Sequence, residues 1–152
     1  MPLFNLDKEE ILAPQDWGFP VPISYGPGRF SEIGNYCYEN QIRNPLIVTD
    51  SGSVKLPFID KLVEILKKAK VNSGIYSKIS PNPRDDEISE GKQLYRNDNH
   101  DAIIAIGGGS AMDGGKSICL TANNEIELFD FEWEKTPQKI GPDNKFPPLI
   151  TI

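Results

Sequence analysis

Histidine and cysteine, the side chains that most often hold transition metals, are scarce in this chain of 152 residues. His100 is the one histidine, and Cys37 and Cys119 lie far apart with no motif around either. A zinc or iron site ordinarily takes two or three imidazoles or a close cysteine cluster, so this chain alone is not expected to complete a metal site. The two cysteines are expected to be reduced packing residues.

Long apolar runs and an excess of basic side chains are also lacking. No run approaches the roughly 18 apolar residues of a membrane span, and the N-terminal sequence MPLFNLDKEE carries acids where a signal peptide needs a basic flank. The formal net charge is -6, and a negative surface repels phosphate backbones and anionic lipid. Nucleic acid and membranes are therefore not expected as partners, and a cytoplasmic location is expected by default.

The composition that is present is that of a globular protein. Hydrophobic residues make up 38% of the chain and charged residues 25%, which lies outside the range of disordered chains. The length predicts a single domain over residues 1–152, large enough to bury about two-thirds of its unfolded surface.

Short apolar runs bounded by turn residues predict the strands. These runs are residues 45–49, 73–77, 102–106 and 149–152, and the second is the weakest. Continuous rather than alternating apolar strands are typical of a parallel sheet that is covered on both faces. A further edge strand at residues 21–25 is weakened by Pro22.

Between these runs the apolar residues recur with the 3.6-residue period of helices. The predicted helices cover about residues 28–40, 53–70 and 110–122, and another begins at the acids 85–87 and runs through Tyr95. Residues 123–148 are polar and proline-rich, and they predict a long loop. The alternation predicts an α/β, Rossmann-like, doubly wound fold with a mostly parallel sheet and right-handed crossovers.

One stretch, AIIAIGGGSAMDGGK at residues 102–116, combines a strand, a glycine turn and a helix. Gly107, Gly108 and Gly109 remove every side chain where the strand ends, so the backbone can approach a ligand closely. The start of the next helix offers unpaired N–H groups and the positive end of its dipole, which suit a diphosphate. Ser110 and Asp113 have the spacing of a capping box and are expected to specify the helix start.

Two better-known phosphate-binding motifs do not fit this stretch. The Rossmann fingerprint needs glycine at its sixth position, where Met112 stands when counting from Gly107. The P-loop needs glycine where Ser110 stands, so hydrolysis of ATP or GTP is not predicted. A glycine-rich connection without a ligand remains the structural alternative.

Two polar residues follow other predicted strands. Asp50 ends the strand 45–49, where a carboxylate can accept hydrogen bonds from an adenosine ribose and repel a 2′-phosphate, which favours NAD over NADP. Its alternative role is to cap the helix near the serines that follow. Asn82 is held between two prolines, and it could bond a cofactor or only its own backbone.

The order of these motifs resembles the iron-containing alcohol dehydrogenase family. The motifs are Gly26-Pro27-Gly28, Val48-Thr49-Asp50, Pro81-Asn82-Pro83 and residues 107–116, and the resemblance runs from about Tyr25 to the end. It implies an N-terminal NAD(P)-binding domain and, in the whole family enzyme, a helical C-terminal domain that binds iron or zinc. Hydride then passes between NAD(H) and a small alcohol or aldehyde. Residues 1–152 are expected to be the first domain alone, with every metal ligand outside them.

The resemblance also implies roles for residues. Gly107, Gly108, Gly109 and Ser110 match the pyrophosphate-binding loop, Asp50 the adenosine-ribose position, Asn82 a cofactor contact, and Asp113 an acidic position near the cofactor. The chain by itself is expected to be inactive, and self-association through its exposed face is a further expectation. Two alternatives stay open: a non-catalytic nucleotide-binding module that needs a partner chain, and a relative of glycerol dehydrogenases or dehydroquinate synthases.

Overall fold

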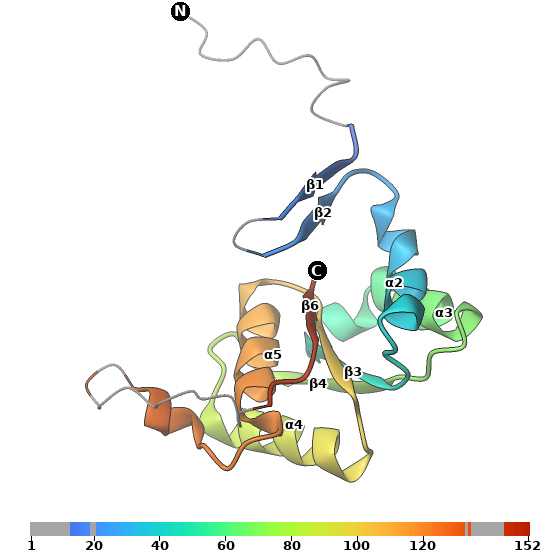
Figure 1. The fold of residues 1–152 in the computed structure, drawn as a ribbon. Coiled ribbons are helices and arrows are strands. Elements are labelled where there is room, and N and C mark those ends of the chain that lie inside the picture. The colour runs from blue at the N-terminus through green and yellow to red at the C-terminus, as the bar shows by residue number, and fades with distance from the viewer. Residues whose placement is uncertain (1–12, 19–20, 133, 135–144) are drawn as a thin grey trace, which may run out of the picture.

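The computed structural model describes residues 13–18, 21–132, 134 and 145–152, and its centre is a four-stranded parallel sheet (Figure 1). The strands are β3 (Pro45–Asp50), β4 (Gly74–Ile79), β5 (Ala102–Ala105) and β6 (Leu149–Thr151). They lie in the order β4-β3-β5-β6, and every neighbouring pair is parallel. All of β5 and all but the last residue of β3 are buried, which is why these strands are continuous apolar runs.

Helices cover both faces of this sheet (Figure 1). The helices are α2 (Ile33–Glu39), α3 (Pro57–Lys68), α4 (Asp85–Asn97) and α5 (Gly109–Ala122). Ile47 and Ile104 pack with α2 and α3 on one face, whereas Leu46 and Ile103 pack with α4 and α5 on the other. The predicted doubly wound α/β fold is confirmed. The chain runs from β3 to β4 and then back across β3 to β5, so the winding reverses between β3 and β5.

Two predicted helices begin differently from the prediction. Ser53–Lys55 form a short 3-10 turn, η2, and α3 begins only at Pro57, because proline suits the first helical position. The helix predicted at residues 28–40 consists of the 3-10 turn η1 (Arg29–Glu32) followed by α2. The predicted loop 123–148 contains one more such turn, η3 (Leu128–Phe131), and part of it lies outside the described residues.

The edge strand predicted at residues 21–25 exists, but it does not belong to the parallel sheet. β2 (Ile23–Tyr25) pairs antiparallel with β1 (Gln15–Trp17) in a separate two-stranded sheet. Figure 1 shows this hairpin apart from the parallel sheet. Pro22 precedes β2 and therefore removes no hydrogen bond from the ladder.

Glycines bring α5 unusually close to the sheet. A Cβ atom at Gly114 would lie 2.6 Å from the Cδ1 atom of Ile79, and one at Gly115 would lie 2.4 Å from the Cβ atom of Ala105. Real Cβ atoms do not approach so closely, so a larger residue at either position would push the helix away from the strands. The second glycine pair of the motif therefore serves helix–sheet packing.

The cysteines and the histidine are buried in the fold. Cys37 and Cys119 are free thiols buried in the two hydrophobic clusters, so their predicted role in packing is confirmed. Burial raises the pKa of each to about 11. The Nδ1 atom of His100 lies 2.9 Å from the carbonyl oxygen of Asn44. Within the described ranges, no three His, Cys, Asp or Glu side chains are grouped to hold a metal. The described helices include none with the length and apolar character needed to cross a bilayer.

Candidate functional site

The loop between β5 and α5 lies at the carboxyl edge of the sheet, beside the point where the winding reverses. Gly107 begins this loop with a φ of 137°, a conformation that side chains rarely permit. A Cβ atom at Gly107 would also lie 3.0 Å from the Cβ atom of Ala111 and 3.2 Å from Oδ2 of Asp50. Glycine is therefore required at this position by the turn itself, with or without a ligand.

Gly108 and Gly109 are different, because none of the described residues requires them to lack a side chain. Gly108 has an ordinary φ of -73°, and a Cβ atom on either residue would meet no atom within 4 Å. This open space adjoins the start of α5, a helix of 14 residues. The first N–H groups of a helix have no intrahelical acceptor, so they and the dipole favour an anion here.

A cleft of about 540 Å³ opens beside the same loop. Its lining residues are Phe30, Ser53, Leu56, Phe58, Lys61, Ile106, Gly107, Gly108 and Ile152. They come from η1, from the segment that follows β3, and from the ends of β5 and β6, so the cleft lies where ligands bind in open α/β sheets. A mainly apolar wall with one ammonium group, that of Lys61, suits a ligand with a flat ring and negative charge.

Asp50 contributes one oxygen to the fold and turns the other toward the glycine loop. Oδ1 accepts hydrogen bonds from the N–H groups of Gly52 at 2.9 Å and Ser53 at 2.8 Å, so it holds the turn after β3, although Gly52 and not Asp50 is the N-cap residue of η2. Oδ2 faces Gly107. The hydrogen bond with the Ser53 side chain is the main cause of a lowered Asp50 pKa, and the amide bonds add to it against burial. The carboxylate is therefore ionised at neutral pH.

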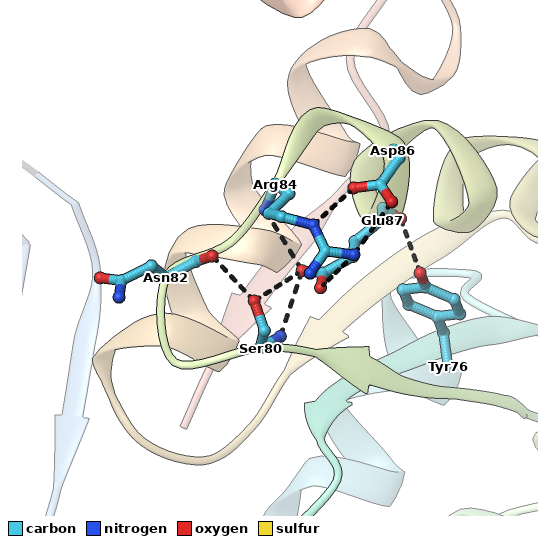
Figure 2. A network of polar contacts seen from close by, with 6 residues as sticks. All are labelled: Tyr76, Ser80, Asn82, Arg84, Asp86 and Glu87. Atoms are coloured by element: carbon cyan, nitrogen blue, oxygen red, sulfur yellow. Dashed lines mark hydrogen bonds and ion pairs between the residues drawn. The ribbon is translucent and has the colours of Figure 1, made fainter.

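The turn after β4 presents Asn82 at the same edge of the sheet. The Asn82 carbonyl oxygen lies 2.8 Å from the Ser80 hydroxyl, and its side-chain amide points away from that contact (Figure 2). No residue of the described chain bonds this amide. The amide is thus exposed and free to bond a ligand.

The predicted capping box of Ser110 and Asp113 is wrong. Gly108 is the N-cap residue and α5 begins at Gly109, so both residues lie inside the helix. The Ser110 hydroxyl instead donates a hydrogen bond of 2.6 Å to the carbonyl oxygen of Pro81. This bond joins the glycine loop to the turn that carries Asn82. Asp113 is exposed, and its Oδ1 atom lies 3.4 Å from Nζ of Lys116.

A buried carboxylate, that of Glu87, lies beneath the turn (Figure 2) and was not among the predicted site residues. Glu87 is 7% exposed, and its Oε2 atom accepts the N–H groups of Ser80 at 3.1 Å and Arg84 at 3.2 Å. Burial alone would raise the pKa of Glu87, but these bonds, with those of the Ser80 hydroxyl and the Arg84 charge, outweigh it and lower the pKa. The available sequence signal was a Glu at the third helical position after the N-cap residue Arg84, from where its carboxylate can accept the N–H group of the N-cap residue.

Acid should destabilise the fold through Glu87. Because its folded pKa is lower than its ordinary value of 4.5, Glu87 adds stability above that pH, and the contribution is lost as the pH falls through the folded pKa. Glu87→Gln should therefore melt at a lower temperature at pH 7 and lose less further stability between about pH 5 and pH 3. Melting curves followed by circular dichroism measure both. Parallel curves for the two proteins would contradict this assignment.

The candidate site lies within a part of the chain that matches a known protein family. The family described as "Iron-containing alcohol dehydrogenase" matches residues 20–152, which include the glycine loop, Asp50 and Asn82. This chain belongs to the iron-containing alcohol dehydrogenase family.

Similar proteins share both sequence and fold with the chain. It is 31% identical to a choline dehydrogenase of Bacillus subtilis, over 97% of the chain and 36% of that protein. It is 30% identical to a 1,3-propanediol dehydrogenase of Klebsiella pneumoniae, over 90% of the chain and 35% of that protein. The solved structure of a 1,3-propanediol oxidoreductase superposes with a TM-score of 0.73 at 31% identity, covering 83% of the chain and 32% of that structure. The chain thus spans about a third of the length of these relatives.

Proposed function

We propose that this chain is the dinucleotide-binding part of an oxidoreductase that moves hydride between NAD(H) and a small alcohol or aldehyde. The observation that carries the proposal is the side-chain-free space at Gly108 and Gly109, in front of the unpaired N–H groups of α5. A diphosphate is the anion that joins two nucleosides, and the adjacent cleft offers room for one of their rings. Relatives that carry NAD in their names support the choice of cofactor, among them an NAD-dependent methanol dehydrogenase of Bacillus methanolicus.

Each site residue then has a defined part. The N–H groups at Gly109 and Ser110 hold the diphosphate, while Oδ2 of Asp50 accepts hydrogen bonds from the adenosine ribose and repels a 2′-phosphate. Asn82 supplies a further cofactor contact through its exposed amide. Asp113 is proposed only as an acidic neighbour of the bound cofactor, since it is exposed on α5.

The cofactor and the chain contribute different parts of the proposed reaction. The nicotinamide ring supplies the hydride chemistry when it is bound. The chain itself neutralises the diphosphate at the start of α5, and the cleft wall at Phe30 and Phe58 excludes water from an apolar ring. The described residues contain no group of three side chains that could hold a metal. Following the family resemblance, we assign the iron or zinc ligands to positions outside residues 1–152 and expect this chain alone to be inactive.

We also propose a cytoplasmic protein whose partners are a dinucleotide and a small substrate. Its acidic net charge disfavours the binding of nucleic acid and anionic membranes. Self-association is part of the same proposal. The second candidate function is a non-catalytic nucleotide-binding module that needs a partner chain. A glycerol dehydrogenase-like or dehydroquinate synthase-like enzyme is a related form of the first.

Titration of the purified chain with NADH, followed by NADH fluorescence and by calorimetry, tests the proposal. We expect saturable binding that excess ADP-ribose reverses, because the diphosphate and adenosine contacts are shared. Alcohol oxidation is then assayed with NAD⁺ and added Fe²⁺ or Zn²⁺, and no turnover is expected. Failure to bind NADH would overturn the proposed function, whereas turnover would overturn the placement of the metal ligands outside this chain.

A further inference from the structure

The turn Pro81–Asn82–Pro83 cannot hold its own shape through backbone hydrogen bonds. Its two prolines have no N–H group and fix only their own φ angles. The turn is exposed, so it gains little from burial. Side-chain contacts must therefore hold Asn82 in one place at the sheet edge.

Glu87 supplies the first of these contacts from inside the fold. It is the third residue of α4, and its Oε2 atom accepts the N–H group of Ser80, before the turn, and that of Arg84, after it. The Ser80 hydroxyl lies 3.1 Å from the same oxygen and 2.8 Å from the carbonyl oxygen of Asn82. One buried carboxylate thus fixes both ends of the turn (Figure 2).

An ion pair and a further hydrogen bond also hold the turn in place. The Arg84 guanidinium lies 3.4 Å from Oε1 of Glu87 and pairs with Asp86 at 2.9 Å. From α5, the Ser110 hydroxyl donates to the Pro81 carbonyl oxygen at 2.6 Å. The turn is consequently held between the start of α4 and the start of α5. The Asn82 amide is left outside this network.

We propose that Glu87 is a positioning residue for the cofactor: it sets dinucleotide affinity through the placement of Asn82, without touching the cofactor. The inference rests on the proposed function, because it needs a ligand at the carboxyl edge of the sheet. The carboxylate is well suited to this task, since one of its oxygens accepts two amide N–H groups and shares the single Ser80 hydroxyl proton with the carbonyl oxygen of Asn82, while the side chain remains buried and charged.

The experiment is a double-mutant cycle on the full chain, with NADH affinity as the readout. Glu87→Ala should weaken NADH binding on the order of tenfold, and Glu87→Gln, which keeps one acceptor oxygen, should weaken it less. In an Asn82→Ala background, the same changes at residue 87 should have no further effect on affinity. Glu90→Gln is the matched control, because Glu90 is on the same helix but is exposed and pairs with Lys78; its NADH affinity should equal that of the unsubstituted chain.

Hydrogen exchange of the segment 80–84 provides a readout that does not depend on binding. Faster exchange there in Glu87→Gln, with unchanged exchange in the strands, is expected if Glu87 holds the turn, and it keeps the test usable should Glu87→Ala not fold. Unchanged NADH affinity in Glu87→Gln, or losses that add to those of Asn82→Ala, would overturn the inference while leaving the proposed function intact. Absence of NADH binding by the unsubstituted chain would instead overturn the proposed function, and this inference with it.

Discussion

Gly109→Ala should weaken NADH binding on the order of tenfold or more while leaving the fold at least as stable. The added methyl group meets no atom of the protein within 4 Å, but it enters the space that we assign to the diphosphate. Alanine is also the better helix former by about 0.5–1 kcal/mol, so the melting temperature should stay the same or rise slightly. Calorimetric titration and thermal melting of the same preparation measure the two effects.

Gly107→Ala is the matched control, because it changes the neighbouring loop residue for a different physical reason. Its φ of 137° and the 3.0 Å approach to Ala111 should make this substitution destabilise the fold by about 1–3 kcal/mol. If Gly109→Ala lowers the melting temperature as much as Gly107→Ala does, or binds NADH with full affinity, the space in front of α5 is not a phosphate site.

Asp50→Asn should shift cofactor preference toward NADPH, with the ratio of NADPH to NADH affinity rising by roughly tenfold. The change removes the negative charge near Gly107 but keeps an Oδ1 acceptor for the N–H groups of Gly52 and Ser53. Discrimination against the 2′-phosphate should therefore weaken with little loss of stability. Parallel titrations with the two reduced cofactors give the ratio.

Two further variants distinguish the effect of the Asp50 charge on cofactor preference from effects on stability and on net charge. Asp50→Gly removes the cap as well, so it should relax the preference in the same direction and also cost about 0.5–2 kcal/mol of stability. Asp60→Asn, on the exposed first turn of α3, changes the net charge equally and should leave the ratio unchanged. An unaltered ratio in Asp50→Asn would remove Asp50 from the cofactor site.

The parallel sheet and its helices could be predicted because the relevant patterns are local. A run such as residues 102–106, which is apolar throughout and ends in glycine, allows few structures other than a buried strand followed by a turn. Pro57 shows where such reasoning fails. The apolar period continues smoothly across it, but the proline makes a new helix start and leaves residues 53–55 as a separate turn.

Contacts between residues that are distant in the chain could not be predicted from the sequence. The hydroxyl of Ser110 has the spacing of a cap, but it bonds Pro81, which lies 29 positions earlier in the chain. The burial of Glu87 depends in the same way on how α4 meets the end of β4. Asp50 was predicted as either a cap or a ligand contact. Its two oxygens face different neighbours, so one carboxylate can both accept N–H groups of the fold and face the proposed ligand site.

The glycines of residues 107–115 divide into groups that face opposite ways. Gly114 and Gly115 face Ile79 and Ala105 in the sheet, while Gly108 and Gly109 face open space. A saturation mutagenesis library of these four glycines should therefore separate into two classes. Variants at the later pair would be recovered as insoluble or easily melted protein, and those at the earlier pair as well-folded protein that fails to be retained on an immobilised nucleotide column.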